Sequence, residues 1–304
     1  MPRSIVLLPL IYVLISTIAH PVNSLAEAIR KPVWAGRFYP ADASDLKDLI
    51  GRLEHRAEKD LPALPNKATL RALIMPHAGY VYSGLTAAHC SRLLGKMDNR
   101  HIRKVIVMAP DHHIGHSSNV ITDCTAYETP LGVVPVHPDV KKLLAGDSLF
   151  RTLPVSDTKE HAIEVILPFL QCHLADVQLI PIIMGAARVV DMADSLLPLL
   201  DKHTLIVASS DLSHYLSYED AIAIDRDTIS RILSSDIKGL EQDRNRACGL
   251  IPVLTLMRLS RIRGWTPILL NYTNSGDTSG VKDQVVGYTG IAYYQINEVN
   301  NDEK

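Results

Sequence analysis

Short, uninterrupted runs of apolar residues recur along this chain, and several of them stop abruptly at polar residues. Residues 72–75, 105–109 and 205–208 form such runs. Runs of this length that are bounded by turn-forming or polar residues are typical of buried β-strands. They are followed by Pro76-His77, by Pro110-Asp111-His112-His113, and by Ser209-Ser210-Asp211-Leu212-Ser213-His214. All three strands therefore present histidine near their C-terminal ends, where open α/β sheets bind ligands.

Helical periodicity separates these strands. Residues 44–56 predict an amphipathic helix with Ser44 as its N-cap, and residues 85–94 predict a helix between the first two strands. This strand–helix–strand order is that of a parallel βαβ unit. Further helices are predicted at residues 138–145, 161–172, 189–202, 220–234 and 253–263, and further strands at 119–122, 132–136, 178–184, 267–272 and 285–294. The pattern indicates an α/β protein of 304 residues, a length that fits one large domain or two small ones.

The N-terminal 26 residues follow a different pattern. Met1-Pro2-Arg3 is positively charged, Ile5 to Ile18 is almost wholly apolar, and Ser24-Leu25-Ala26 supplies small residues. This is the arrangement of a cleavable secretory signal peptide, and the apolar stretch is short for a membrane span. An uncleaved N-terminal anchor and a misassigned start codon are the alternatives. We expect a periplasmic or extracellular protein if the leader is cleaved, and a membrane-anchored or cytoplasmic one otherwise.

Composition narrows the classes of function. The net charge is −2 and aromatic residues make up 5% of the chain, so no nucleic-acid partner is indicated. Membrane contact is expected only through an uncleaved leader. The unusual feature is the number of histidines, 13. The four cysteines are widely spaced and do not indicate a disulfide framework, and Cys90 and Cys172 are predicted to be small buried residues.

Five side chains form the candidate site. They are His77, His112, Asp211 and His214 at strand ends, and Cys248 before a predicted helix. A helix N-terminus is expected to lower the pKa of the Cys248 thiol and so to favour the thiolate. Two imidazoles and a thiolate are typical zinc ligands, and the soft thiolate also suits copper(I) or iron. The alternative is that these histidines only form hydrogen bonds at the strand ends.

Several longer motifs occur in a fixed order along the chain. They are Trp34-Ala35-Gly36-Arg37-Phe38-Tyr39-Pro40, His77-Ala78-Gly79-Tyr80, Pro110-Asp111-His112-His113, Tyr127-Glu128-Thr129-Pro130-Leu131-Gly132, His161-Ala162-Ile163-Glu164 with Leu167-Pro168, Ser209-Ser210-Asp211-Leu212-Ser213-His214, and Cys248-Gly249. Together they resemble the Memo family, also called AmmeMemoRadiSam system protein B in bacteria and archaea. The resemblance spans about Lys31 to Ile296.

The resemblance implies a fold similar to that of class III extradiol dioxygenases of the LigB type. This fold is a single-domain α/β sandwich in which helices flank a mixed central sheet, expected here at residues 27–296 and followed by a frayed tail at 297–304. The resemblance also implies that His77, His112 and Cys248 bind a transition metal ion, with iron or copper ahead of zinc. Asp211 and His214 are the implied catalytic residues.

The roles of the residues near these motifs are less clearly indicated by the sequence. His113 is expected either to support the ligands or to pack in the core. His161 and Glu164, three residues apart on one helix face, either support the ligands or form a pair at a helix N-terminus. The other histidines are interpreted as surface or structural residues: His89, His116, His137, His173 and His203.

Three functions remain open at this point. The first is a metal-dependent redox enzyme in which Asp211 orients His214 as a proton donor or acceptor. The second is a non-catalytic protein that binds copper, iron or a peptide. The third is an extradiol-type dioxygenase acting on a phenolic substrate, although Cys248 in place of a carboxylate ligand disfavours ring cleavage. The family resemblance further implies AMMECR1-like and radical SAM pathway partners.

Overall fold

The computed structural model describes residues 28–115, 118–146 and 148–296. The predicted leader at residues 1–26 and the predicted tail at 297–304 lie outside these ranges. Within them, none of the helices combines the length and the apolar character that crossing a membrane requires.

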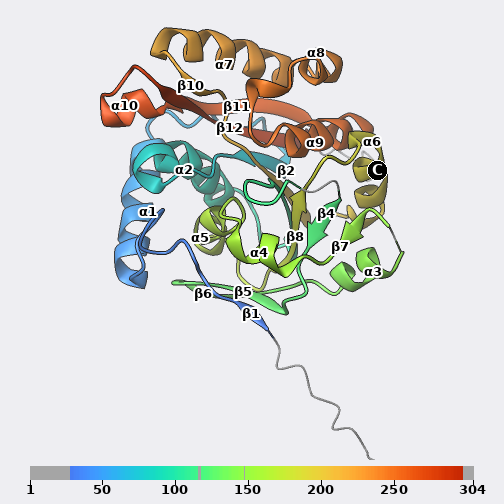
Figure 1. The fold of residues 1–304 in the computed structure, drawn as a ribbon. Coiled ribbons are helices and arrows are strands. Elements are labelled where there is room, and N and C mark those ends of the chain that lie inside the picture. Colours follow the sequence, from blue (N-terminus) through green and yellow to red (C-terminus); the bar gives the residue numbers. More distant parts are fainter. Residues whose placement is uncertain (1–27, 116–117, 147, 297–304) are drawn as a thin grey trace, which may run out of the picture.

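A large mixed sheet contains most of the predicted strands (Figure 1). Its centre is parallel, in the order β2, β9, β3, β8, while β12 runs antiparallel to β2 and β4 antiparallel to β8. The bounds are β2 Ala68–Met75, β3 Lys104–Pro110, β4 Asn119–Ile121, β7 Phe150–Arg151, β8 Gln178–Met184, β9 Thr204–Ser209, β10 His214–Leu216, β11 Thr266–Asn274 and β12 Val285–Ile296. A smaller sheet joins β1 Ile29–Arg30, β5 Ala126–Thr129 and β6 Gly132–Pro135. The expected α/β sandwich with a mixed central sheet is confirmed.

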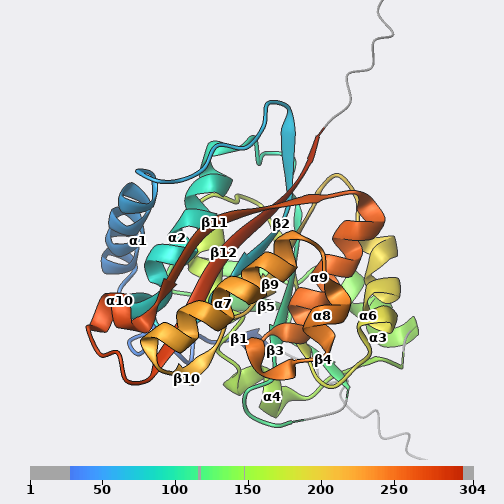
Figure 2. The ribbon, with the colours of Figure 1, turned by 90° about the horizontal axis from the view of Figure 1, so that it is seen from above.

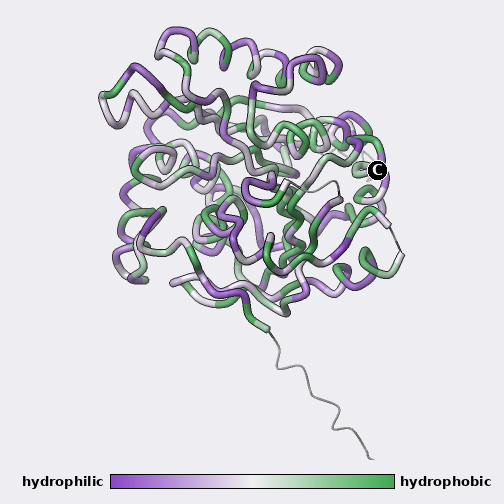
Figure 3. The backbone as a smooth tube through the Cα atoms, in the orientation of Figure 1, coloured by the Kyte–Doolittle hydropathy of each residue, from purple (hydrophilic) through white to green (hydrophobic). Residues whose placement is uncertain are grey.

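Helices cover both faces of the large sheet, as the two ribbon views show (Figures 1 and 2). One face packs against α1 Ala43–Ala57, α2 Tyr80–Lys96 and α5 Leu167–Gln171, and the other against α3 Asp139–Gly146, α6 Val189–Leu196, α7 Tyr218–Leu233, α8 Ile237–Glu241 and α9 Leu250–Arg263. Along β2, Leu73 and Met75 belong to the first core, and Ala72 and Ile74 to the second. Because both faces are buried, the central strands are continuous apolar runs in the sequence (Figure 3).

Several predicted helices differ from the observed ones at their ends. The N-cap of α1 is Asp42, whose carboxylate accepts from the N–H groups of Ser44 and Asp45, so the prediction of Ser44 is wrong. The predicted helix at residues 161–172 is a turn followed by the 3₁₀ helix η1 Glu164–Ile166 and by α5. The predicted helix at residues 189–202 is α6 followed by the 3₁₀ helix η2 Leu197–Leu199. Short elements that were not predicted are β1, β5, β7, β10, α8, α4 Pro154–Lys159, η3 Arg244–Arg246 and α10 Ser275–Ser279.

Candidate metal centre

The C-terminal ends of three adjacent strands bring together side chains that are far apart in the sequence. Because β9 lies between β2 and β3, His77 after β2, His112 after β3 and Asp211 after β9 share one edge of the sheet. His161, from the turn before η1, joins them. The ring centroids are 5.1 Å apart for His77 and His112, 5.3 Å for His77 and His161, and 4.5 Å for His112 and His161.

The surroundings of His77 decide which of its two ring nitrogens is free. The Ser209 hydroxyl donates to the carbonyl of Ala162 at 2.6 Å, so its oxygen accepts from Nδ1 of His77 at 2.8 Å. Burial and the charge of His112 lower the pKa of His77 well below its ordinary value, which keeps the ring neutral at physiological pH. With the ring proton on Nδ1, Nε2 carries a free lone pair.

Glu160 holds His112 and the backbone around His161. Its carboxylate accepts from Nδ1 of His112 at 2.9 Å and from the backbone N–H groups of His112, His161 and Ala162 at 2.8, 2.9 and 2.9 Å. Burial opposes the charge of Glu160, but the hydrogen bond and charge of His112 hold its pKa at about 2. Burial also opposes the charged form of His112, but Glu160 raises the pKa of that ring above its ordinary value. A carboxylate behind an imidazole in this way fixes the tautomer and orientation of a metal ligand.

His161 lies within the group of imidazoles rather than behind it. Burial and the charge of His77 lower the pKa of His161 to about 3, so this ring is neutral at physiological pH. Its Nδ1 atom is buried and lies 3.3 Å from Oε1 of Glu160, but it forms no hydrogen bond with any described residue. A buried polar atom without a partner costs roughly 1–3 kcal/mol, and coordination of an ion by this ring offers one way to recover part of that cost.

The three imidazoles fit a transition metal ion. One ligand atom from each of His77, His112 and His161 lies within 4.8 Å of the other two. Imidazole nitrogen is a good ligand for zinc, copper, iron and nickel, and two of these rings are already oriented through the opposite nitrogen. The group differs in one member from the set implied by the family resemblance, because it contains His161 and not Cys248.

Cys248 lies beside the three imidazoles. Its Sγ atom is 3.3 Å from Nε2 of His77 and 3.3 Å from the backbone nitrogen of Asp211. The helix α9 begins at Leu250, just after Cys248, and was expected to lower the pKa of the thiol. That prediction is wrong for the metal-free protein, because burial and the negative charge of Asp211 raise the pKa of Cys248 instead. Cys248 is therefore a protonated thiol that can donate a hydrogen bond to Nε2 of His77, the ring nitrogen without a proton.

Asp211 and His214 complete the predicted site. The Asp211 carboxylate accepts from the backbone N–H of His77 at 2.8 Å, and burial raises its pKa to about 6. Nδ1 of His214 donates to the carbonyl of Leu212 at 2.8 Å. In the described part of the chain Asp211 and His214 interact through charge but no hydrogen bond joins their side chains. Leu212, and not Asp211 as expected, thus orients the ring of His214.

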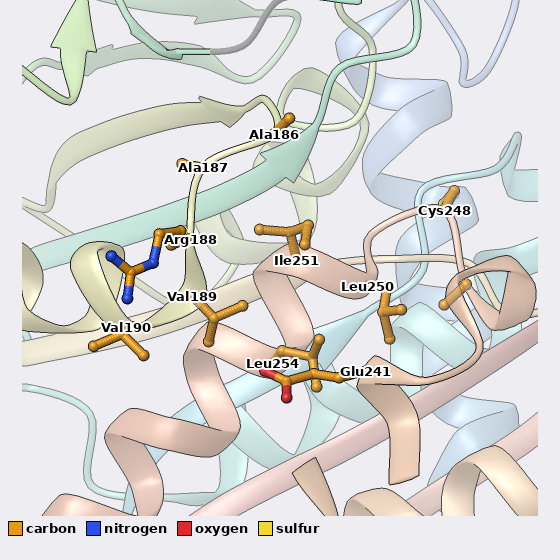
Figure 4. Close-up of a pocket in the computed structure, with 11 residues that line it drawn as sticks. Ala186, Ala187, Arg188, Val189, Val190, Glu241, Cys248, Leu250, Ile251 and Leu254 are labelled. Atoms are coloured by element: carbon orange, nitrogen blue, oxygen red, sulfur yellow. The ribbon is translucent and has the colours of Figure 1, made fainter. Parts of the chain in front are cut away.

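Cys248 also lines a cavity of about 600 Å³ (Figure 4). Ala186 to Val190, before and at the start of α6, form one wall, and Leu250, Ile251 and Leu254 of α9 form another. Figure 4 shows Cys248 and Arg188 at opposite ends of this cavity. Its size suits a small molecule, and its lining is mainly apolar.

Residues 28–40, which we call the N-terminal segment, form hydrogen bonds and an ion pair with the loop that carries His161. Arg30 is 4% exposed and forms an ion pair with Glu164 at 2.7 Å. Glu164 is fully buried and also accepts from the N–H groups of Val33 and Trp34 and from the hydroxyl of Tyr39, at 3.0, 2.8 and 2.6 Å. Arg30 further donates to the carbonyl of Glu160 at 2.7 Å. Glu164 therefore faces the N-terminal segment.

The aromatic side chains of this segment pack against the metal-binding group. The ring centroids of Phe38 and Trp34 lie 4.9 and 5.5 Å from that of His161. The prediction that His161 and Glu164 share a helix face is wrong, because His161 precedes η1 and is directed to the other imidazoles. The N-terminal segment thus forms one wall of the candidate metal centre.

Two residues of this site were missed in the sequence. Glu160 directly precedes the motif that begins at His161, and Ser209 is the first residue of the motif after β9. Both residues lie within or beside motifs that the sequence analysis names, so their positions in the chain could have indicated that they belong to the site. Their partners, His112 and His77, are 48 and 132 residues away in the chain, which no local pattern indicates.

Gly249 sets how closely α9 approaches β9. A Cβ atom at Gly249 would lie 2.3 Å from the carbonyl oxygen of Ser209 and 2.6 Å from Cβ of Ser210. We predict that Gly249→Ala displaces the neighbouring Cys248 from His77 and lowers the free energy of unfolding by about 1–3 kcal/mol. Chemical denaturation measures the loss, and mass spectrometry after alkylation should show faster labelling of Cys248.

Gly51 provides the matched control for this change. It lies inside α1, and a Cβ atom there would meet nothing within 4 Å. Gly51→Ala should therefore stabilise the protein by about 0.5–1 kcal/mol, since alanine favours the helix. Unchanged stability and unchanged labelling in Gly249→Ala would show that the end of β9 can move without cost.

The remaining histidines and cysteines for which the sequence predicted a role lie outside the candidate metal centre. His113 is exposed and stacks on Trp34, with ring centroids 6.0 Å apart, so it is not a core residue. His89 is buried and bonds to the Leu85 carbonyl and to Asp60, as a structural histidine does. His137, His173 and His203 also form hydrogen bonds or ion pairs, and His116 lies outside the described residues. All four cysteines are free; Cys90 is buried as expected, but Cys172 is exposed and that prediction is wrong.

Comparison with known proteins gives a consistent result. A family model described as Memo-like protein matches residues 30–292. A MEMO1 family protein of Methanosarcina mazei is 35% identical over 279 residues, covering 86% of this chain and 98% of the relative. MEMO1 family proteins of Caldivirga maquilingensis and Thermoplasma volcanium are 32% and 34% identical over 283 and 272 residues, covering 88% and 86% of this chain and 99% and 97% of the relatives. The matched residues include the whole candidate metal centre.

Proposed function

This chain belongs to the Memo family, and from that premise we propose that it is a metal-binding protein with redox activity. The proposed ligands are His77, His112 and His161, with Cys248 as a fourth. The observation that carries the proposal is the convergence of three imidazoles, each with a ring nitrogen within 4.8 Å of those of the other two. Bound iron or copper would supply one-electron chemistry at this point.

Cys248 is suited to join these ligands once an ion is present. Its sulfur already lies 3.3 Å from Nε2 of His77, one of the proposed ligand atoms. A thiol loses its proton when it coordinates a metal ion, because the thiolate is the ligating form. The raised pKa of Cys248 therefore makes its participation depend on the ion, and the thiol is held protonated and protected until then.

Asp211 and His214 are the proposed groups that hold and move protons. Burial places the pKa of Asp211 at about 6, so this carboxylate can take up or release a proton close to neutral pH. Nδ1 of His214 is committed to the carbonyl of Leu212, which leaves Nε2 as its exchanging atom. A substrate in the cavity beside Cys248 would approach the centre from the side of α6 and α9.

Metal analysis tests this proposal directly. Wild-type protein purified without oxygen is loaded with Fe²⁺, Cu⁺ or Zn²⁺, and mass spectrometry gives the number of ions bound per chain. Oxygen consumption by the loaded protein is then measured with thiols and with catechols as substrates. One tightly held ion with oxygen consumption is the expected result. A wild-type protein that retains no transition metal contradicts the proposal. Tight binding without oxygen consumption would support a non-catalytic metal-binding function instead.

The Cys248→Asp variant examines the extradiol alternative in the same assays. It restores a carboxylate beside two imidazoles, the ligand set that iron-dependent oxygenases use. Catechol cleavage gained by this variant would indicate that the geometry still supports dioxygenase chemistry. We expect no gain, because His161 also occupies the centre and leaves fewer open positions for a substrate and oxygen.

Glu160→Gln should weaken metal binding about 10- to 100-fold at alkaline pH, because the carboxylate that orients His112 is lost. The pH dependence should change as well. In the wild type the ion competes with a proton on His112, whose pKa Glu160 raises, so affinity increases with pH through that raised value. Without the carboxylate the pKa of His112 is lower, so the increase of metal affinity with pH should occur at lower pH. Isothermal titration calorimetry across a pH series measures both effects; an unshifted profile would contradict the assignment.

A further inference from the structure

Asp225 of α7 is a fully buried carboxylate that no step of the proposed function uses. Among the described residues it belongs to no group of metal-ligating side chains and forms no ion pair with a Lys, Arg or His side chain. Aspartate is rarely buried in full without such a partner, because burial opposes its charge. The hydrogen bonds of Asp225 are therefore the contacts that stabilise this carboxylate.

The Asp225 carboxylate accepts hydrogen bonds from two other elements. Oδ1 accepts from the backbone N–H of Ser213 at 3.0 Å, and Oδ2 accepts from the hydroxyl of Tyr272 in β11 at 2.8 Å. At this point α7 packs across β10, β11 and β12 (Figure 1). Because Ser213 lies between Asp211 and His214, Asp225 connects α7 to the segment that carries both proposed proton-moving groups.

The same segment pairs with β12. The N–H of Leu212 donates to the carbonyl of Gly287 at 2.8 Å, and the N–H of Gly287 donates to the carbonyl of Ser213 at 2.9 Å. Position 287 needs glycine, because a Cβ atom there would overlap the carboxylate of Asp225. The carboxylate therefore lies directly against the part of β12 to which the segment is bonded.

The position of the His214 ring depends on this backbone. Its Nδ1 atom donates to the carbonyl of Leu212 at 2.8 Å, within the same segment. Burial raises the pKa of Asp225, while its hydrogen bonds from Ser213 and Tyr272 and the charge of His214 act in the opposite direction. Asp225 and His214 thus interact through charge as well as through the backbone between them.

We propose that Asp225 is a positioning residue for His214, which fixes through the N–H of Ser213 the backbone on which the imidazole is oriented. The proposal rests on the proposed function, in which His214 holds and moves a proton. The three proposed imidazole ligands follow β2 and β3 or precede η1, outside this segment. Loss of the Asp225 carboxylate should therefore displace His214 and leave the metal ligands in place.

Hydrogen exchange of the metal-free protein, followed by mass spectrometry, tests whether Asp225 holds the segment. Asp225→Ala should accelerate exchange in residues 210–217 about 10-fold or more, since a hydrogen bond to a charged acceptor is lost. Asp225→Asn has the same shape and keeps an acceptor oxygen, so it should exchange nearly as the wild type does. Asp225→Leu also has this shape but no acceptor, and it gives the same test if the alanine variant does not fold.

The metal-loaded protein tests the consequence for the reaction. Asp225→Ala should lower kcat for oxygen consumption about 10- to 100-fold, because a misplaced group near the reacting atoms has effects of this size. KM and the number of bound ions should stay those of the wild type. Asp225→Asn should recover most of kcat.

Asp139→Ala is the matched control for a general loss of stability. Asp139 is another buried carboxylate, and it pairs with Lys104 at the start of β3, whereas His112 follows the end of that strand. This variant should be less stable than the wild type, but exchange in residues 210–217 and kcat should not change.

The outcomes separate this proposal from the proposed function. Unchanged exchange of residues 210–217 in Asp225→Ala, or equal acceleration in Asp139→Ala, overturns the positioning role. Faster exchange with unchanged kcat overturns it too, because the position of the segment would then not matter for the reaction. A wild-type protein that consumes no oxygen contradicts the proposed function and with it the effect on kcat, while the exchange result still decides whether Asp225 holds the segment.

Discussion

His161→Ala is expected to weaken metal binding at least about 100-fold, the upper range for losing a residue that merely supports a ligand. The reason is that His161 supplies one of the three converging nitrogens of this group. Anaerobic titration with a competing chelator measures the change. The same titration on Cys248→Ala ranks the two residues as ligands.

The comparison decides between two ligand sets. If His161→Ala loses more affinity than Cys248→Ala, the three imidazoles form the primary site and the thiol is auxiliary. The reverse order would support the set of His77, His112 and Cys248 implied by family resemblance and would demote His161 to a supporting residue. His214→Ala is the matched control, because its ring is anchored to Leu212 and lies outside both groups of ligands. It should retain the affinity of the wild type.

The second large effect concerns stability. Glu164→Ala should lower the free energy of unfolding by about 3–5 kcal/mol, because the buried guanidinium of Arg30 loses the carboxylate 2.7 Å away and keeps only that of Asp157 at 4.0 Å. It also removes the acceptor for two N–H groups and for the Tyr39 hydroxyl. Guanidinium chloride denaturation followed by circular dichroism measures the loss.

An exposed ion pair in the same region is the control. Lys31 and Glu128 pair at the surface, where such pairs contribute about 0–1 kcal/mol. Glu128→Ala should therefore be nearly neutral. Equal losses in the two variants would mean that the N-terminal segment is held by its other contacts. A faster local release should also be visible in Glu164→Ala as increased hydrogen exchange of the Val33 and Trp34 amides.

The strands were the most predictable part of the molecule. The observed bounds of β8 agree with the predicted 178–184, and β3 and β9 extend the apolar runs 105–109 and 205–208 by one residue at each end. The reason is physical: a strand covered on both faces must be apolar throughout, so burial is visible in a short window of sequence. Placing His77, His112 and Asp211 at one edge followed from those strands.

The hydrophobic pattern did not reveal two parts of the site, the turn at His161 and the protonation state of Cys248. Residues 161–172 have a helical pattern, but the backbone before Glu164 is held in a turn by Glu160. This turn is what directs His161 to the centre. For Cys248, the helix-terminus argument gave the wrong sign, because desolvation and the Asp211 carboxylate outweigh a helix end. The Cys248 outcome depends on a residue 37 positions away in the chain, whereas Glu160 directly precedes the turn that it holds.

The strand order has a consequence for how the protein matures. In the sheet, β2 is flanked by β9 and β12, whose residues begin at Thr204 and Val285. During synthesis, the strand that carries His77 has neither neighbour until most of the chain has left the ribosome. Pairings at such sequence separations form slowly, because a long loop must close first. We therefore expect the metal centre to form late in folding, once β9 has been synthesised and lies between β2 and β3.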